Sequence, residues 1–190
     1  MRNVRTKPLE LWDIHGPVLE ILAKEEKGII TNYITSPADP TKTLSLKLPF
    51  LVLQMKNMNS PFSLEITTID DKRQERRFRI STFQRKPKVT SQLCALPCYL
   101  SLGWNHLVID LNQLSTRAYN SGHVETNDIQ IHGNCRLRRV YFSDKMYAEE
   151  DLSPEFTLFA TDISNTRKKE EDEGVTTFPL FQKPNNSSKR

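Results

Sequence analysis

The feature that most constrains this chain is an alternation of apolar and polar residues with a period of two, repeated in several short stretches. Such alternation is typical of a β-strand that buries one face, because successive side chains of a strand point to opposite sides of the sheet. The clearest example is the stretch 44–52, in which Ser45 and Lys47 are expected on the polar face. The apolar face is expected to hold Leu44, Leu46, Leu48, Phe50 and Val52.

Three further stretches alternate in the same way. Residues 62–80 predict a hairpin, because the polar segment "DDKRQE" (70–75) separates two alternating runs. A strand after Trp104 is expected to bury Leu107, Ile109 and Leu111 and to point Asn105 and Asp110 outward. Phe156 and Leu158 predict a last short strand.

The alternation slips by one residue in the segment from Ile129 to Tyr147. Either "HGN" (132–134) forms a turn, or one extra residue near Arg138 and Arg139 forms a β-bulge. In both interpretations the arginines point outward. The side chains expected in the core are Ile131, Leu137, Val140 and Phe142.

Helical patterns are few and short, whereas a parallel α/β sheet needs a helix between successive strands. "LNQLSTRAY" (111–119) predicts one helix, and "SPEF" (153–156) after the acidic "AEED" predicts a single helical turn. The sequence therefore predicts an all-β fold, an antiparallel β-sandwich of jelly-roll type with one or two short helices.

One domain is expected over residues 1–162, followed by a disordered tail over 163–190 whose charge block and Pro/Asn/Ser end cannot form a core. Within the tail, "TFPLF" (177–181) is a candidate docking segment. We expect a cytoplasmic protein without a membrane span, because the chain shows no signal-like segment and no apolar run of ~20 residues. Its three cysteines are expected to be reduced.

Chemistry-bearing residues are poorly spaced for catalysis or metal binding. Cys94, Cys98, His132 and Cys135 are the candidate zinc ligands, but Cys94 and Cys98 on one strand would lie ~13 Å apart, which favours buried reduced cysteines and a hydrogen-bonded histidine. The acidic groups at 70–71 and 149–151 fall in turn-like, solvated segments where nothing would raise the pKa of a carboxyl group. We therefore expect no enzyme activity, no metal and no cofactor.

Half of the net charge of +4 comes from residues 163–190, so the rest of the chain is nearly neutral, and its basic residues gather in two clusters, at 72–88 and at 136–139 with Lys145 nearby. Guanidinium groups on a rigid sheet suit carboxylates or phosphates, although the nearly neutral body and the lack of a known motif argue against nucleic acid. The candidate partner-binding residues are Arg76, Arg77, Arg79, Arg136, Arg138, Arg139 and Lys145.

A ligand-binding sandwich is the alternative, because exposed aromatic rings on this fold can stack on sugars. The candidate rings are Trp12, Tyr33, Trp104 and Tyr119. We expect Trp104 and Tyr33 in the core instead.

Several segments resemble, in order and spacing, the cilia- and flagella-associated protein 20 family. They are "KPLELWD" (7–13), "YITSPADPTKTLSLKLPFLV" (33–52), "DDKRQERRFRIS" (70–81), "GWNHLVIDL" (103–111), "TRAY" (116–119) and "IQIHGNCRLRRVYFSDKMYAEEDLSPEF" (129–156). The resemblance runs from about Lys7 to Phe159, and some differences indicate a paralogue or divergent form.

The resemblance implies a β-sandwich of jelly-roll type and a structural, non-catalytic role at the inner junction of ciliary doublet microtubules, where the B-tubule joins the A-tubule. It implies tubulin and the Parkin co-regulated protein as partners, and a place in the cytoskeleton of the axoneme, basal body or centriole. Tubulin surfaces are acidic, so outward arginines would suit them.

The chain departs from the family in its N-terminal part. Only residues 14–17 separate "KPLELWD" from Val18, where family members have a segment long enough for a strand. One edge strand is expected to be missing, and the open edge would make the protein depend on a neighbour.

Overall fold

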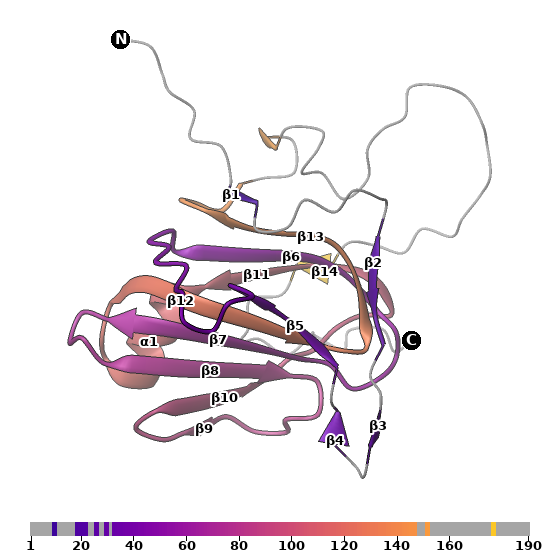
Figure 1. Ribbon diagram of the computed structural model, residues 1–190, viewed down its shortest axis with the longest axis horizontal. Coiled ribbons are helices and arrows are strands. Elements are labelled where there is room, and N and C mark those ends of the chain that lie inside the picture. Colours follow the sequence, from indigo (N-terminus) through magenta and orange to yellow (C-terminus); the bar gives the residue numbers. More distant parts are fainter. Residues whose placement is uncertain are drawn as a thin grey trace, which may run out of the picture.

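Two β-sheets packed face to face form the body of the chain (Figure 1). The structure, a computed structural model, describes residues 18–22, 32–147 and 151–152 in full and only the backbone of residues 9–10, 25–26, 29–30 and 176–177. The predicted all-β sandwich is confirmed. None of the described helices is long and apolar enough to cross a membrane.

Sheet I has β6 at its centre. Its strands, in spatial order, are β1 (Leu9–Glu10) and β2 (Leu19–Ile21), both beside β13 (Cys135–Ser143), then β6 (Phe50–Asn57), β11 (Gly103–Asp110) and β14 (Thr176–Thr177). All neighbours in this sheet run antiparallel except β11 and β14, which are parallel.

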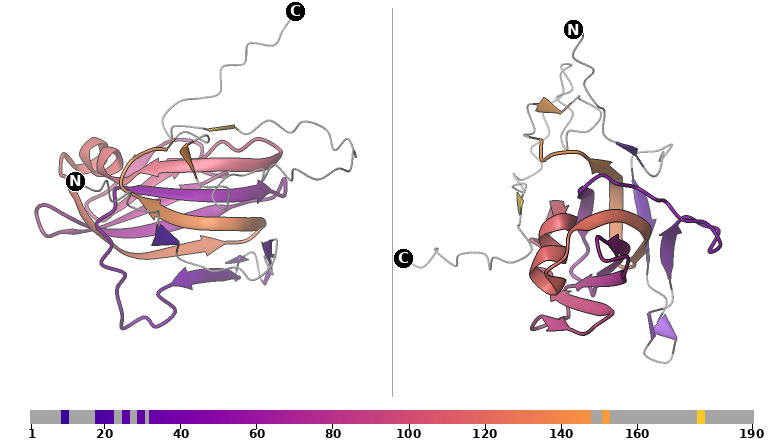
Figure 2. Two further views of the ribbon diagram at one scale, coloured as in Figure 1. Left: turned by 90° about the horizontal axis from the view of Figure 1, so that it is seen from above. Right: turned by 90° about the vertical axis from the view of Figure 1, so that its left-hand side faces the viewer.

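Sheet II lies on the other side of the core. Its order is β5 (Tyr33–Ser36), β12 (His123–His132), β7 (Ser63–Asp70), β8 (Glu75–Ser81), β10 (Leu93–Pro97) and β9 (Lys88–Val89), with only β8 and β10 parallel. A separate pair, β3 (Glu25–Glu26) and β4 (Ile29–Ile30), completes the described strands. Figure 2 shows the helix α1 (Leu111–Tyr119) at one end of the sandwich.

The predicted strand at residues 44–52 is wrong in its start and its inward face. Ser45 has a left-handed φ of 49°, Pro49 precedes the strand, and β6 begins only at Phe50. Beyond that break the odd positions Leu51, Leu53 and Met55 are fully buried in the core, whereas Val52 lies on the outer side of the sheet in a second cluster. The alternation therefore restarts with the opposite parity.

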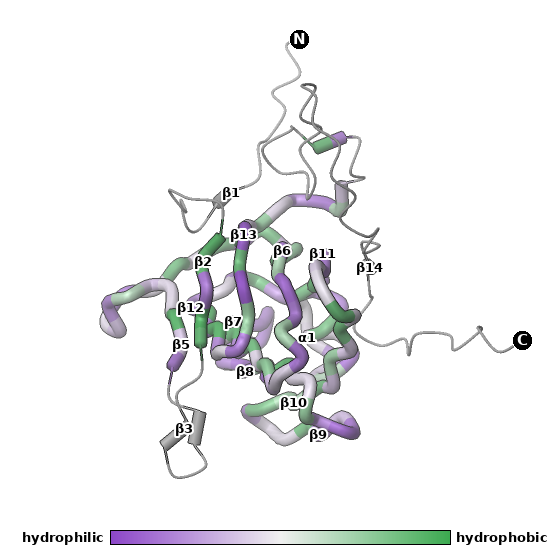
Figure 3. The backbone as a smooth tube through the Cα atoms, turned by 90° about the vertical axis from the view of Figure 1, so that its right-hand side faces the viewer, coloured by the Kyte–Doolittle hydropathy of each residue, from purple (hydrophilic) through white to green (hydrophobic). Residues whose placement is uncertain are grey.

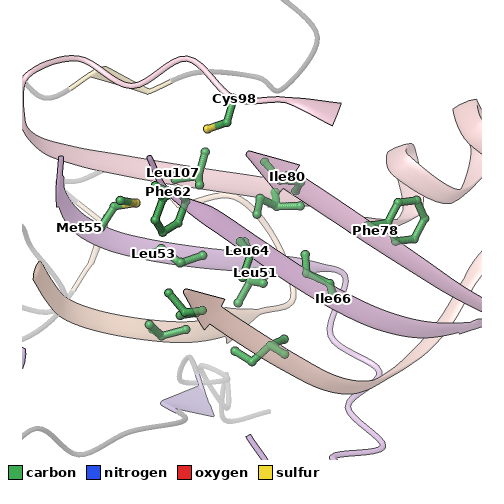
Figure 4. Close-up of a cluster of buried hydrophobic side chains, with 14 of the residues drawn as sticks. Leu51, Leu53, Met55, Phe62, Leu64, Ile66, Phe78, Ile80, Cys98 and Leu107 are labelled. Carbon is green, nitrogen blue, oxygen red and sulfur yellow. The ribbon is translucent and has the colours of Figure 1, made fainter. Parts of the chain in front are cut away.

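The hairpin prediction is confirmed by β7 and β8, which enclose a polar turn at residues 71–74. The inward side chains of this hairpin are fully buried: Phe62, Leu64, Ile66, Phe78 and Ile80. Figure 4 shows them packed against residues of sheet I.

The strand after Trp104 and the helix are also confirmed, with one correction. Leu107, Ile109 and Leu111 are buried as expected, and Asp110 caps α1 by accepting a 2.8 Å hydrogen bond from the Gln113 N–H. Asn105 does not point outward: it shares the inward parity of Leu107 and is 1% exposed. Its amide satisfies backbone groups of the preceding loop, which allows a polar side chain at that position.

Both interpretations of the segment 129–147 are realised. Residues 133–134 form the turn between β12 and β13, and the register of β13 against β6 shifts between Leu137 and Arg139. Ile131, Leu137, Val140 and Phe142 are all fully buried, as predicted. Hydrophobic and hydrophilic residues alternate along β13 in Figure 3.

The outer edge of β13 is covered in two pieces. β2 pairs with Cys135–Leu137 and β1 pairs with Tyr141–Phe142, so two short strands lie along this edge of sheet I. Within the predicted tail, β14 lies beside β11; the rest of the tail, "SPEF", Phe156 and Leu158 fall outside the described residues.

Candidate partner-binding surface

The two arginine clusters lie on opposite faces of the sandwich. Arg77 and Arg79 occupy β8 in sheet II and share the parity of Glu75, which is exposed, while Phe78 and Ile80 enter the core. Arg136, Arg138 and Arg139 occupy β13 in sheet I. Because the core separates the two outer faces, one flat partner contacts only one of these clusters at a time.

Arg76 is held inside the domain. It has the inward parity of Phe78, its side chain is 14% exposed, and its Nε lies 2.8 Å from Oδ2 of Asp70. Its guanidinium carbon stands 4.3 Å from the centre of the Tyr119 ring on α1, and it also bonds to the carbonyl of Ser91. These contacts tie the β7–β8 hairpin to the helix, which leaves Arg76 poorly placed to meet a partner.

The expectation that the acidic residues 70–71 are both solvated is wrong for Asp70. Its carboxylate is fully buried, and Oδ1 accepts hydrogen bonds from the backbone N–H groups of Lys72 (3.0 Å) and Gln74 (2.8 Å). Burial alone would raise the pKa of Asp70, but the Gln74 N–H and the Arg76 guanidinium outweigh it and hold the pKa below its ordinary value. A carboxylate kept ionised in this way is a structural anchor and a poor general acid.

The outer face of sheet II carries a mixed polar surface. Arg77 is exposed, and Arg79 donates through Nε to Oε1 of Glu65 at 2.9 Å. His132 lies 3.9 Å from the same carboxylate oxygen. Burial lowers the pKa of His132, Glu65 opposes that effect and Arg79 reinforces it, so the ring is mainly neutral at pH 7. The positive charge available on this face therefore comes from Arg77 and from exposed Lys88 on β9.

The β-bulge sets the direction of the arginines on β13. Leu137 and Val140 both enter the core, so the two residues between them lie on the outer side, and Arg138 and Arg139 are each half-buried there. Arg136 donates through Nε to Oε1 of Glu20 on β2 at 3.0 Å, which offsets part of its charge. This face is thus less strongly basic than the sequence indicated.

Lys145 lies just beyond β13. It is exposed, and its ammonium group stands 4.9 Å from the centre of the Tyr147 ring. Lys145 therefore adds a positive charge on the sheet I side, beyond the end of β13.

The cysteines lie in the core. Burial raises the pKa of Cys94 to about 11 and the pKa values of Cys98 and Cys135 to about 12, so all three thiols are protonated at pH 7. His132 faces outward and shares a 3.1 Å hydrogen bond with Gln130. Within the described part of the chain, no three His, Cys, Asp or Glu side chains gather as metal ligands.

The aromatic candidates are placed differently from expectation. Tyr33 is not in the core: it is 50% exposed at the β5 edge, with its ring centre 5.3 Å from that of His132. Trp104 is half-buried on the outer side of sheet I, because it has the opposite parity to Leu107. Tyr119 lies beneath Arg76, and Trp12 falls outside the described residues.

One surface was missed in the sequence pattern. Residues 76–109 contain six Lys or Arg and no Asp or Glu, and they include several apolar side chains that the fold leaves exposed. The signal that could have revealed it is the length of this acid-free run, which begins with the arginines of β8 and continues through Arg85, Lys86 and Lys88.

Comparison with known proteins shows which family this chain resembles. Residues 8–160 match the CFA20 domain. The chain is 44% identical over 172 residues to cilia- and flagella-associated protein 20 of Chlamydomonas reinhardtii, covering 83% of this chain and 89% of that protein. The corresponding proteins of Paramecium tetraurelia and Caenorhabditis elegans are each 42% identical, covering 83% of this chain and 88% and 83% of their own lengths.

Proposed function

Because the chain belongs to the CFA20 domain family, whose relatives are cilia- and flagella-associated proteins, we propose that it is a structural component of the axoneme. In this role it helps to join the A- and B-tubules at the inner junction of doublet microtubules and so supports the stability and motility of the cilium. The observation that carries the proposal is the continuity of the match, which spans every described strand except β14. No catalytic step is part of it.

The arrangement of charge supports a joining role. Arg77 and Lys88 stand on the outer face of sheet II, and Arg138, Arg139 and Lys145 lie on the side of sheet I. A rigid sandwich with basic groups on two opposite faces can contact two acidic surfaces at once. We assign tubulin to one face and a junction neighbour, such as the Parkin co-regulated protein, to the other.

Localisation tests the proposal as a whole. A tagged copy in ciliated cells is expected along the axoneme, with additional signal at basal bodies or centrioles. Diffuse signal in the cytosol or nucleus, with none along the axoneme, would refute the axonemal role.

Microtubule co-sedimentation tests the charged faces. Binding is expected to weaken as salt rises, because exposed charges are screened over about 8 Å at physiological ionic strength. We expect charge reversal at exposed Lys145, or separately at exposed Arg77, to reduce binding while the melting temperature is kept. Reversal of exposed Arg73, which lies in the turn near α1, is the matched control. Equal binding by all variants would refute the assignment of these faces.

A ligand-binding sandwich is the second candidate, and exposed Tyr33 beside His132 is the observation that favours it. A sugar that stacks on this ring should raise the melting temperature of the wild type, and Tyr33→Ala should abolish the shift. Trp104→Ala serves as the comparison on the opposite sheet. No shift with a panel of common glycans would leave the structural role as the better account.

A further inference from the structure

The β8–β11 region of the chain carries an unusual charge pattern. Residues 76–109 hold six Lys or Arg and no acidic residue. Arg76, Arg77 and Arg79 lie on β8, whereas Arg85 and Lys86 are exposed in the connection that follows it. The positive charge of this connection therefore has no acidic neighbour in its own part of the sequence.

Topology brings two connections of this region together at one end of the sandwich. β8 and β10 are parallel, so the segments that leave them, residues 82–87 and 98–102, start from the same end, opposite α1 (Figure 1). The N–H of Cys98 donates to the carbonyl of Ser81 at 2.8 Å, which holds the two exits side by side. We call residues 82–87 and 98–102 the loop end.

Large apolar side chains of the loop end are exposed. Phe83 is 54% exposed, Tyr99 38% and Leu102 66%. Scattered exposed apolar residues are ordinary, but here three of them stand on two segments that leave the sandwich at the same end, and one of these segments also carries exposed Arg85 and Lys86.

The segment 98–102 is fixed by two asparagine side chains. Asn105 donates from Nδ2 to the carbonyls of Ser101 (3.0 Å) and Gly103 (2.8 Å) and accepts from the Ser101 N–H (2.9 Å). Asn57, at the end of β6, donates to the Ser101 carbonyl at 3.1 Å. Gly103 has a φ of 84°, a conformation that favours glycine.

The base of the same segment is anchored in the core. Cys98 is 5% exposed, and Figure 4 shows it near Leu107 at one end of the hydrophobic cluster. A buried anchor and a buried asparagine on either side hold Tyr99 and Leu102 in place before any partner arrives. Such preorganisation lowers the entropy cost of binding.

We propose that the loop end is a docking site for an acidic polypeptide segment that carries a large apolar side chain. Arg85 and Lys86 pair with its carboxylates, and Phe83, Tyr99 and Leu102 cover its apolar side chain. The exposed charges of Arg85 and Lys86 select this occupant over a second copy of the chain, because two copies of the same basic surface repel each other. The proposal does not depend on the axonemal role.

The test uses the full chain and a fluorescein-labelled peptide of glutamates with one central phenylalanine, followed by fluorescence anisotropy. Binding is expected in the micromolar to millimolar range at low salt. Phe83→Ser with Leu102→Ser should weaken it about tenfold or more, as truncation of buried apolar anchors does. Arg85→Glu with Lys86→Glu should weaken it and flatten its salt dependence.

Two matched variants at other places on the surface serve as controls. Val124→Ser removes a 40% exposed apolar side chain from β12, and Arg73→Glu reverses a charge in the turn near α1. Both should bind the peptide as the wild type does. Because all substituted residues are exposed, the melting temperature should stay unchanged, and this is checked for each variant.

Three outcomes would overturn the proposal. The first is equal binding by wild type and the Phe83 and Leu102 variant, or equal affinity for an all-glutamate peptide. The second is concentration-dependent dimerisation in sedimentation that these substitutions abolish, because the occupant would then be another copy. The third is binding to anionic phospholipid vesicles through the same residues without peptide binding. Microtubules are absent from every arm, so failure here is separate from failure of the axonemal role.

Discussion

Replacing Asp70 by Asn is expected to destabilise the domain far more than its turn-like sequence suggests. Asp70 accepts from the N–H groups of Lys72 and Gln74 through one oxygen and from Nε of Arg76 through the other. An asparagine presents one NH₂ group, so at least one of these donors would face another donor. The substitution also leaves Arg76, 14% exposed, without its counter-charge.

The expected cost is about 3–5 kcal/mol, the range for breaking a buried ion pair by removing one partner. Urea denaturation at pH 7, followed by circular dichroism, measures it. Asp71→Asn is the matched control: Asp71 is exposed and accepts a 2.9 Å hydrogen bond from the Gly122 N–H. We expect it to cost at most about 1 kcal/mol, the net value of an ordinary hydrogen bond, because the asparagine oxygen can still accept from the Gly122 N–H.

The destabilisation caused by Asp70→Asn should depend on pH in a direction that the pKa of Asp70 determines. The pKa of Asp70 is depressed in the folded state, so its contribution is fully present above the unfolded value of about 3.9 and is lost as pH falls through the lower folded value. The destabilisation by Asp70→Asn should therefore shrink only in strongly acidic buffer. Equal costs for the two asparagine variants at pH 7 would refute the account of Asp70 as a structural anchor.

Other predictions follow from the core. Phe142→Ala should cost about 3–5 kcal/mol in urea denaturation, because it leaves a cavity in a fully buried site. Asn105→Ala should cost about 1–3 kcal/mol, because it leaves buried backbone groups of the loop end unsatisfied. Cys94, Cys98 and Cys135 should react with a thiol reagent at pH 8 only after unfolding, since their pKa values are about 11 to 12; rapid reaction of the folded protein would contradict their burial.

Sequence alternation predicted strands well where nothing interrupted the chain. The β7–β8 hairpin was predictable because each of its strands has one apolar and one polar side, and the inward residues of β13 were predictable because the slip in the alternation showed that a bulge could separate Leu137 from Val140. Val52 was not, because the left-handed Ser45 and Pro49 reset the parity before β6 and because both faces of that strand are covered. A strand that is apolar on both faces has no alternation in its sequence, so the pattern does not indicate which side chains face the core.

Side-chain partners were the other limit of the sequence. Arg76 and Arg77 are neighbours in the chain, yet one is bound to Asp70 inside the domain and the other is exposed. Asn105 was expected outside because it is polar, and only the backbone groups that it binds explain its burial. Such partnerships depend on which strands become neighbours, and the local pattern does not contain that information.

The central position of β6 in sheet I has a consequence for biosynthesis. Val52 pairs with Val108 on one side and with Tyr141 on the other, so neither partner of β6 exists until much of the chain has been made. Among the described strands of the two sheets, local hairpins that can form early, β7–β8 and β9–β10, lie only in sheet II. On the ribosome, the two backbone edges of β6 therefore stay unpaired until β11 and then β13 emerge, and we expect the nascent protein to need chaperones until that point.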